Sequence, residues 1–318
     1  MTISKMMTLA LRALSYAEPG GRDYRLERIF QSLTHPSLPA LYTVWEHHVI
    51  SKDGYEVPMR IFYPKAMASE ELLLFFHGGG WVSGTIDTYS KTCADLADAV
   101  GRRVVSVDYR LAPEYPFPHG LEDCYAAARE LFLHSDMFHG DVPEIILMGD
   151  SAGGNLSAAV SLLAAARGEF YVKRQILLYP AVYYDYTESS PFPSVWENGE
   201  GYLLTSKKVQ EYMELYSPDP RQRKSPYVAP ILAPKLSGQP ETLIITAEFD
   251  PLRDEGEAYG EKLRKAGCTV WVVRFPDMLH GFFSLPVRFA PVRRCHAYIK
   301  RFLDGTIGEI ENAGKTDS

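Results

Sequence analysis

Two patterns of hydrophobic residues alternate along most of this chain. Short apolar runs predict buried strands at 72–76, 103–107, 145–148, 176–179, 242–246 and 269–275. Between and after them, apolar residues spaced three and four apart predict helices at 93–100, 121–132, 152–167, 255–265 and 287–303. Two further strand patterns, 42–50 and 55–63, flank Asp53-Gly54 and predict an antiparallel hairpin.

The alternation predicts an α/β fold. Because the connections are short, we expect a mostly parallel sheet with helices on both faces and the hairpin at one edge. Residues 183–237 depart from the pattern: they are rich in Tyr, Pro and Ser, and hold one helical stretch, 207–216. We predict an insertion over the carboxyl ends of the strands, where such sheets bind ligands.

The predicted organisation has three parts. Residues 1–40 are expected to form helices and loops that, together with the insertion, make a cap. Residues 41–305 form the main domain, and residues 306–318 a C-terminal tail. The segment 2–16 predicts an amphipathic helix docked on its own domain, with a membrane-surface role as the alternative. A signal peptide is disfavoured because Arg12, on the polar face, interrupts the continuous apolar stretch that a signal peptide needs.

Composition narrows the function classes. The net charge is −7 with no long basic block, which argues against nucleic acid as a partner. No apolar run approaches the ~20 residues of a membrane span, so no membrane partner is expected. The four cysteines, Cys93, Cys124, Cys268 and Cys295, are far apart in the sequence, as expected for free buried thiols in a reducing compartment. We therefore predict a cytoplasmic protein.

One strand ends in a pattern that carries chemistry. The run 145–148 continues into Gly149-Asp150-Ser151-Ala152-Gly153, and a helical pattern follows. In this strand–turn–helix context, Gly-x-Ser-x-Gly predicts a serine nucleophile on a sharp turn, because its small neighbours let strand and helix pack closely. The alternative is an ordinary turn with a capping serine.

Such a serine needs a base to take its proton and a third group to hold that base. Asp250 follows the strand 242–246 and His280 follows the strand 269–275, so both are expected at carboxyl ends of strands, in the order Ser, Asp, His. We predict the triad Ser151–Asp250–His280. Three acids compete with Asp250 as the orienting group: Glu248, Asp254, which also resembles a helix N-cap, and Asp277.

Acyl transfer also needs hydrogen-bond donors for the developing oxyanion. His77-Gly78-Gly79-Gly80 follows the strand 72–76 and is the type of loop that supplies such donors in lipases and esterases. We predict donors from Gly78, Gly79 and Gly80, favouring the last two, and from Ala152 N–H. His77 is expected to hold the loop. A phosphate cradle is excluded because no Walker Lys-Ser/Thr follows, and no metal-ligand spacing occurs.

With these motifs, the chain resembles the hormone-sensitive-lipase family of α/β-hydrolases, in its bacterial esterase branch. The motifs are His77-Gly-Gly-Gly80-Trp81, Asp108-Tyr-Arg-Leu-Ala-Pro-Glu114, Gly149-Asp-Ser-Ala-Gly-Gly154, Glu248-Phe-Asp-Pro-Leu-Arg-Asp254 and Leu279-His-Gly-Phe282. The resemblance spans roughly residues 40–305 and is greatest to acetyl esterases and short-chain carboxylesterases. It implies an α/β-hydrolase fold with a helical cap, the triad and oxyanion roles above, small-molecule esters as substrates, no cofactor, and often a homodimer through an edge strand.

The predicted function is hydrolysis of short-chain acyl esters, acetyl to about hexanoyl, by a serine carboxylesterase. A non-catalytic ligand receptor on the same fold is disfavoured by the intact triad residues, whereas an amidase or peptidase would share them. The pocket walls are predicted at Trp81, Tyr183, Trp196, Tyr202 and Leu203. Packing within the insertion is the alternative role for these side chains.

Overall fold

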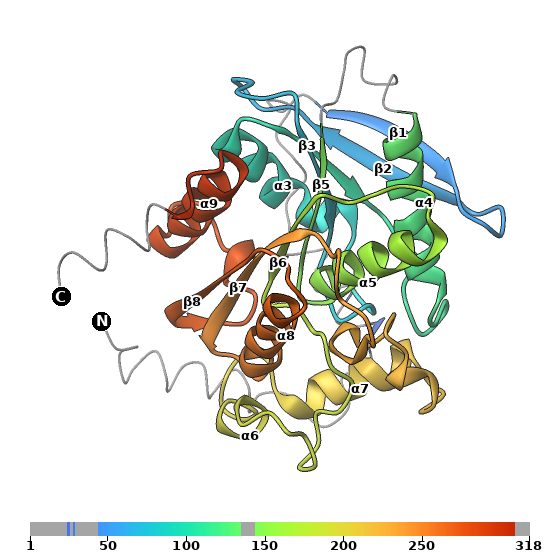
Figure 1. Cartoon of the computed structure of the whole chain (residues 1–318), viewed down its shortest axis with the longest axis vertical. Coiled ribbons are helices and arrows are strands. Elements are labelled where there is room, and N and C mark those ends of the chain that lie inside the picture. The colour runs from blue at the N-terminus through green and yellow to red at the C-terminus, as the bar shows by residue number, and fades with distance from the viewer. Residues whose placement is uncertain (1–23, 26–27, 29–43, 135–143, 309–318) are drawn as a thin grey trace.

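The computed structural model describes residues 24–25, 28, 44–134 and 144–308 (Figure 1). Its centre is an eight-stranded sheet of order β1-β2-β4-β3-β5-β6-β7-β8. Only β2 runs against its neighbours among these strands, so the predicted mostly parallel sheet with an edge hairpin is confirmed. The strands are β1 (Val44–Ile50), β2 (Glu56–Phe62), β3 (Leu72–Phe76), β4 (Arg103–Val107), β5 (Ile145–Asp150), β6 (Arg174–Leu178), β7 (Glu241–Phe249) and β8 (Val270–Leu279).

Helices cover both faces of this sheet (Figure 1). On one face lie α3 (Ile86–Val100) and α9 (Ala290–Leu303); on the other lie α4 (His119–Leu133), α5 (Ala152–Arg167) and α8 (Arg253–Lys265). The strands β3 and β4 are buried along their whole length, which is why they appear in the sequence as continuous apolar runs. Helices α3, α8 and α9 instead bury one stripe each, which produces a period of about 3.6 residues, whereas α5 is buried on every side from Ala152 to Ala164.

Several element boundaries differ from the prediction for local reasons. Helix α3 begins at Ile86 rather than at residue 93, because the Thr85 side chain accepts a hydrogen bond from Thr88 N and caps the helix. Helix α9 begins at Ala290, three residues later than expected. Strand β8 continues past Phe275 to Leu279 through a register shift opposite β7.

The insertion 183–237 is built from short elements. It contains α6 (Ser194–Glu197), α7 (Ser206–Tyr216) and two 3₁₀ turns, Gln222–Lys224 and Pro230–Leu232. Figure 1 shows α6 and α7 together at the end of the molecule where α8 begins. The partner segment of the predicted cap, residues 1–40, lies outside the described residues except for Tyr24, Arg25 and Arg28, and so does the amphipathic helix predicted at 2–16. The tail 306–318 is described only to residue 308.

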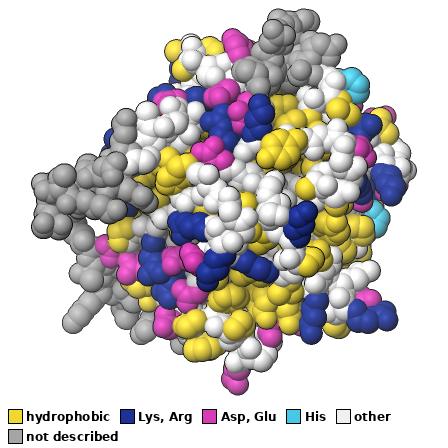
Figure 2. All heavy atoms as spheres, viewed as in Figure 1, with side chains coloured by type: hydrophobic (Ala, Val, Ile, Leu, Met, Phe, Trp, Pro, Cys, Tyr) yellow, Lys and Arg dark blue, Asp and Glu magenta, His cyan; other side chains and the backbone are white. Residues whose placement is uncertain are grey.

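The surface is mixed in character. Figure 2 shows basic and acidic side chains interspersed with apolar ones over the face in view. Within the described residues, no helix combines the length and the apolar character needed to cross a bilayer. The four cysteines are all free. Cys93, Cys124 and Cys295 are buried, whereas Cys268 is only partly buried.

Candidate active site

The turn between β5 and α5 presents Ser151 in a strained conformation. Its backbone has φ 54° and ψ −118°, in a region that non-glycine residues rarely adopt. Ser151 N donates to Leu178 O on β6 at 2.8 Å, which fixes the turn to the sheet. A Cβ on Gly153 would lie 1.9 Å from Phe76 O, so only glycine lets α5 approach β3 this closely.

Two loops bring a histidine and an aspartate to this serine. His280 follows β8 directly, and its Nε2 lies 2.8 Å from Ser151 Oγ. Asp250 follows β7 directly, and its Oδ2 lies 2.8 Å from His280 Nδ1. The serine, the histidine and the aspartate therefore form one hydrogen-bonded chain at the carboxyl ends of β5, β8 and β7. Because a carboxylate can only accept, the histidine proton sits on Nδ1, which leaves Nε2 to accept from the serine hydroxyl.

Asp250 is held in a fixed orientation. Its side chain is fully buried, and Oδ1 accepts from Leu252 N at 2.9 Å while Oδ2 faces His280. The ring of Tyr179 stands edge-on against the imidazole of His280, with ring centroids 4.8 Å apart. Tyr179 itself has φ 34°. The imidazole is thus confined between an aromatic ring and a buried carboxylate.

The three competing acids make other contacts, Asp277 through its backbone amide. Glu248 Oε2 accepts from Asp277 N at 2.7 Å, which ties the histidine loop to β7. Asp254 Oδ2 accepts from Ser194 N at 2.7 Å, and Oδ1 pairs with Arg253. The prediction that Asp254 caps α8 is wrong, because the N-cap position belongs to Leu252 and Asp254 lies inside the first turn. Asp250 is the one of the four that contacts His280 in the described part of the chain.

The triple-glycine loop lies beside the serine turn. Gly78 N donates to Asp150 Oδ1 at 2.8 Å, so its amide is already engaged. No hydrogen bond joins Gly79 N or Gly80 N to another described residue. The two residues have φ 119° and 61°, backbone conformations that favour glycine. Ala152 begins α5, where amide groups have no partner inside the helix.

His77 packs inside the protein, where burial lowers its pKa and keeps the imidazole neutral. Its Nδ1 donates to Gly78 O at 2.8 Å, and its ring stacks on Tyr109 at 4.3 Å. Tyr109 OH in turn donates to His77 O at 2.7 Å. These contacts hold the glycine loop in place.

Asp150 connects the glycine loop with the serine turn. Besides Gly78 N, it accepts from Tyr89 OH at 3.0 Å and from Tyr179 OH at 3.4 Å. Burial raises the pKa of Asp150 to about 6, although the hydrogen bonds from Tyr89 and Gly78 act in the opposite direction. Asp150 belongs to the Gly-x-Ser-x-Gly motif, but that motif did not indicate that the Asp150 carboxylate joins the glycine loop to the serine turn.

The five predicted pocket residues lie in different environments. Trp81 is buried and stacks on Tyr216, with ring centroids 4.6 Å apart. Tyr183 packs edge-on against Phe192, and Tyr202 stacks on Phe249, the neighbour of Asp250. Trp196 and Leu203 expose 57% and 61% of their surface. Contact of these side chains with a substrate stays a prediction.

The described residues contain no group of three or more His, Cys, Asp or Glu side chains arranged to hold a metal ion. The chemistry offered by the site is that of a serine hydroxyl aligned with a base, next to backbone amides that can receive a negative charge.

Comparison with known proteins gives a consistent result. A family model described as "alpha/beta hydrolase fold" matches residues 73–284. The carboxylesterase NlhH of Mycobacterium tuberculosis is 34% identical over 308 residues, which is 93% of this chain and 94% of that protein. The ethyl acetate hydrolase of Pseudomonas putida is 33% identical over 240 residues, 74% of each chain.

The structural comparison agrees. The solved structure of a hyperthermophilic esterase from the archaeon Pyrobaculum calidifontis superimposes with a TM-score of 0.82 at 34% identity, covering 95% of this chain and 99% of that one. The range matched by the family model, residues 73–284, contains the glycine loop, the serine turn and the histidine loop. The chain therefore belongs to the hormone-sensitive-lipase-like family of α/β hydrolases.

Proposed function

We propose that this protein is a serine carboxylesterase that hydrolyses esters with short acyl chains, from acetyl to about hexanoyl, through a covalent acyl-enzyme. The reaction class, carboxylic ester hydrolysis, is supported by esterase relatives that match nearly the whole chain. The observation that carries the mechanism is the continuous chain of hydrogen bonds from Ser151 Oγ through His280 to the buried Asp250.

In the proposed mechanism, His280 Nε2 takes the hydroxyl proton as Ser151 Oγ attacks the ester carbonyl carbon. Asp250 stabilises the imidazolium that forms and holds its Nδ1–H in place. The imidazolium then protonates the leaving alcohol, and the acyl group stays on Ser151. A water molecule, deprotonated by His280, attacks the acyl-enzyme in the same way and releases the carboxylic acid.

The negative charge on the carbonyl oxygen is assigned to the amides of Gly79, Gly80 and Ala152. This assignment is supported by the engagement of Gly78 N with Asp150, which removes Gly78 from the set of free donors. Backbone amides of a fixed loop are effective here because they need no reorganisation when the charge develops.

The glycine loop provides a direct test of this assignment. Gly79→Ala is expected to lower kcat by roughly 10²–10³-fold, the loss typical of a missing oxyanion donor. A Cβ at residue 79 would lie 2.2 Å from Ser83 O at φ 119°, so the loop and its amides must shift. Initial rates with p-nitrophenyl acetate measure the effect. Gly168→Ala is the matched control, because Gly168 also has positive φ (68°) but nothing within 4 Å. Equal kcat in both variants would contradict the assignment.

The acyl-chain range is the second test. The ethyl acetate hydrolase among the relatives is named for an ester with a two-carbon acyl group, which supports the short end of the range. Initial rates on p-nitrophenyl esters from acetate to palmitate are expected to peak between acetate and hexanoate. A peak at the long esters would overturn the short-chain proposal while keeping the esterase. Absence of turnover on every ester, from a folded protein, would overturn the esterase itself.

A further inference from the structure

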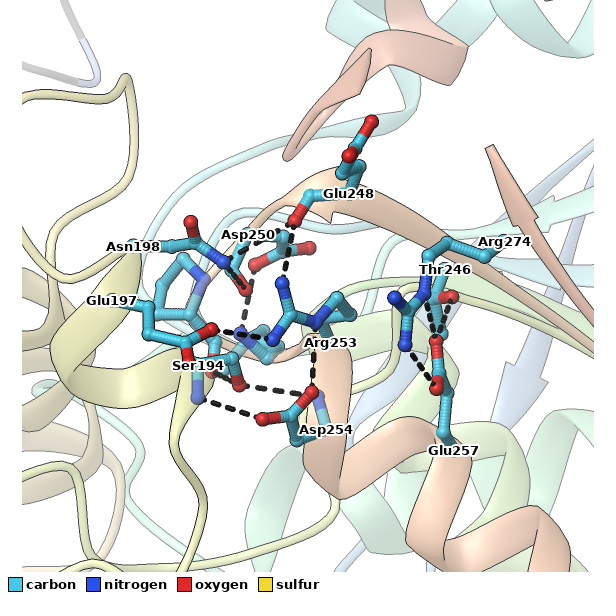
Figure 3. Close-up of polar contacts among 12 residues, drawn as sticks. Ser194, Glu197, Asn198, Thr246, Glu248, Asp250, Arg253, Asp254, Glu257 and Arg274 are labelled. Carbon is cyan, nitrogen blue, oxygen red and sulfur yellow. Dashed lines mark hydrogen bonds and ion pairs between the residues drawn. The ribbon is translucent and has the colours of Figure 1, made fainter. Parts of the chain in front are cut away.

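The short helix α6 of the insertion contacts the turn that carries Asp250. Asn198 is the C-cap residue directly after this helix and exposes only 4% of its surface. Its Nδ2 donates to Glu248 O at 3.2 Å and to Asp250 O at 3.3 Å (Figure 3). We call residues 248–251 the acid turn. A side chain of the insertion thus holds two backbone carbonyls of the acid turn, one of them that of Asp250 itself.

Arg253, in the first turn of α8, holds the acid turn from another direction. Its NH1 donates to Glu248 O at 3.2 Å, the same carbonyl that Asn198 contacts. Its NH2 donates to Glu197 Oε2 at 2.8 Å, and its Nε to Asp254 Oδ1 at 2.7 Å (Figure 3). The planar guanidinium group uses three nitrogens for three partners, a geometry that lysine cannot reproduce.

The start of α6 is fixed in the same way. Ser194 Oγ donates to Pro251 O at 2.8 Å and accepts from Asp254 N at 3.1 Å. Three carbonyls of the acid turn, those of residues 248, 250 and 251, are therefore bound by the side chains of Ser194, Asn198 and Arg253. These contacts surround the backbone of Asp250. The side chains of Ser194, Asn198 and Arg253, however, make no hydrogen bond to His280 or Ser151.

We infer that Asn198 and Arg253 are positioning residues, through which the insertion sets the orientation of Asp250 toward His280. The inference rests on the proposed esterase mechanism. Displacement of a catalytic group by about 1 Å can lower the rate by about 10²-fold. The carboxylate of Asp250 has no freedom to compensate, because both of its oxygens are already engaged. Loss of a contact to the acid turn is therefore transmitted to the hydrogen bond with His280.

A second arginine nearby serves as a matched control. Arg274 on β8 donates to Glu257 of α8 at 2.7 and 2.8 Å, and Thr246 joins the same carboxylate (Figure 3). Like Arg253, Arg274 pairs with a carboxylate of α8. Among the described residues, however, Arg274 makes no contact with the acid turn. Arg274→Ala removes an arginine–carboxylate pair while leaving Asp250 untouched.

The first measurement is steady-state kinetics on p-nitrophenyl acetate. Asn198→Ala and Arg253→Ala are each expected to lower kcat by about 10–10²-fold with KM little changed, because the substrate is not contacted. Arg253→Lys should recover only part of the loss, and Arg274→Ala should match the wild type. If Asn198→Ala does not fold, Glu197→Gln replaces it, because this variant weakens only the ion pair between Glu197 and Arg253. An unchanged kcat in Glu197→Gln would then overturn the inference.

Two further readouts distinguish positioning from a general structural role. In the Asp250→Asn background, Asn198→Ala should lower kcat little further, because the group it positions has been removed. The low-field proton NMR signal of the histidine–aspartate hydrogen bond should shift or broaden in Asn198→Ala and stay unchanged in Arg274→Ala. Additive losses together with an unchanged signal would overturn the inference. Full activity of Ser151→Ala would instead overturn the proposed function, so the two failures are distinguishable.

Discussion

Replacement of Ser151 by alanine is expected to lower kcat by roughly 10⁶-fold, the loss that removal of the nucleophile causes in enzymes with a serine–histidine–aspartate triad. The hydroxyl of Ser151 is the only one that hydrogen-bonds His280 Nε2 in the described part of the chain. The fold should stay intact, because Ser151 is fixed by backbone contacts, N to Leu178 O and O to Asn155 N, that alanine retains.

The measurement is the initial rate on p-nitrophenyl acetate, with circular dichroism to establish folding. Ser157→Ala is the control, since Ser157 is a buried serine of α5, the helix that follows Ser151, and its hydroxyl donates to Gly153 O at 2.9 Å. This control should keep wild-type kcat. Substantial turnover by purified Ser151→Ala protein would mean that another group is the nucleophile.

Asp250→Asn is expected to lower kcat by about 10⁴-fold with little change in KM. The amide has the shape of the carboxylate but places an N–H donor where His280 Nδ1 now donates. The imidazole must then carry its proton on Nε2, facing Ser151, and can no longer act as the base. The loss is smaller than that of Ser151→Ala because the nucleophile is still present.

The control for Asp250→Asn is Asp277→Asn, a change to the competing acid in the histidine loop. The backbone N–H of Asp277 donates to Glu248 Oε2 and so ties the histidine loop to β7, and Asp277→Asn keeps this hydrogen bond. We expect kcat close to that of the wild type. A large loss in Asp277→Asn combined with a small one in Asp250→Asn would reverse the assignment of the orienting acid.

Much of this fold could be predicted because burial leaves a pattern of apolar residues in the sequence. The strands β3 and β4 and the helix α5 follow their apolar patterns closely, and Gly101 ends α3 in the left-handed conformation expected of a C-cap. The order Ser151, Asp250, His280 likewise follows from strand ends. These features depend on local sequence and on one topological rule, that the carboxyl ends of parallel strands meet at one edge of the sheet.

The remaining features depend on contacts between distant segments. Helix α6 has four residues, which is too short for any period to show. Asn198 has no local signal either, since its partners lie about 50 residues further along the chain. Strand β8 was predicted to stop before Pro276, but the register shift opposite β7 carries it to Leu279 and so sets the position of His280.

The central claim is that Ser151 forms a covalent bond with the acyl carbon, and trapping that bond tests it most directly. The protein would be treated with an organophosphate that carries a p-nitrophenolate leaving group, then digested and mapped by mass spectrometry. We predict one phosphoryl adduct, located on Ser151, that forms in step with the loss of esterase activity. Complete inactivation with Ser151 unmodified, or an adduct on another residue that accounts for the loss, would contradict the proposed mechanism.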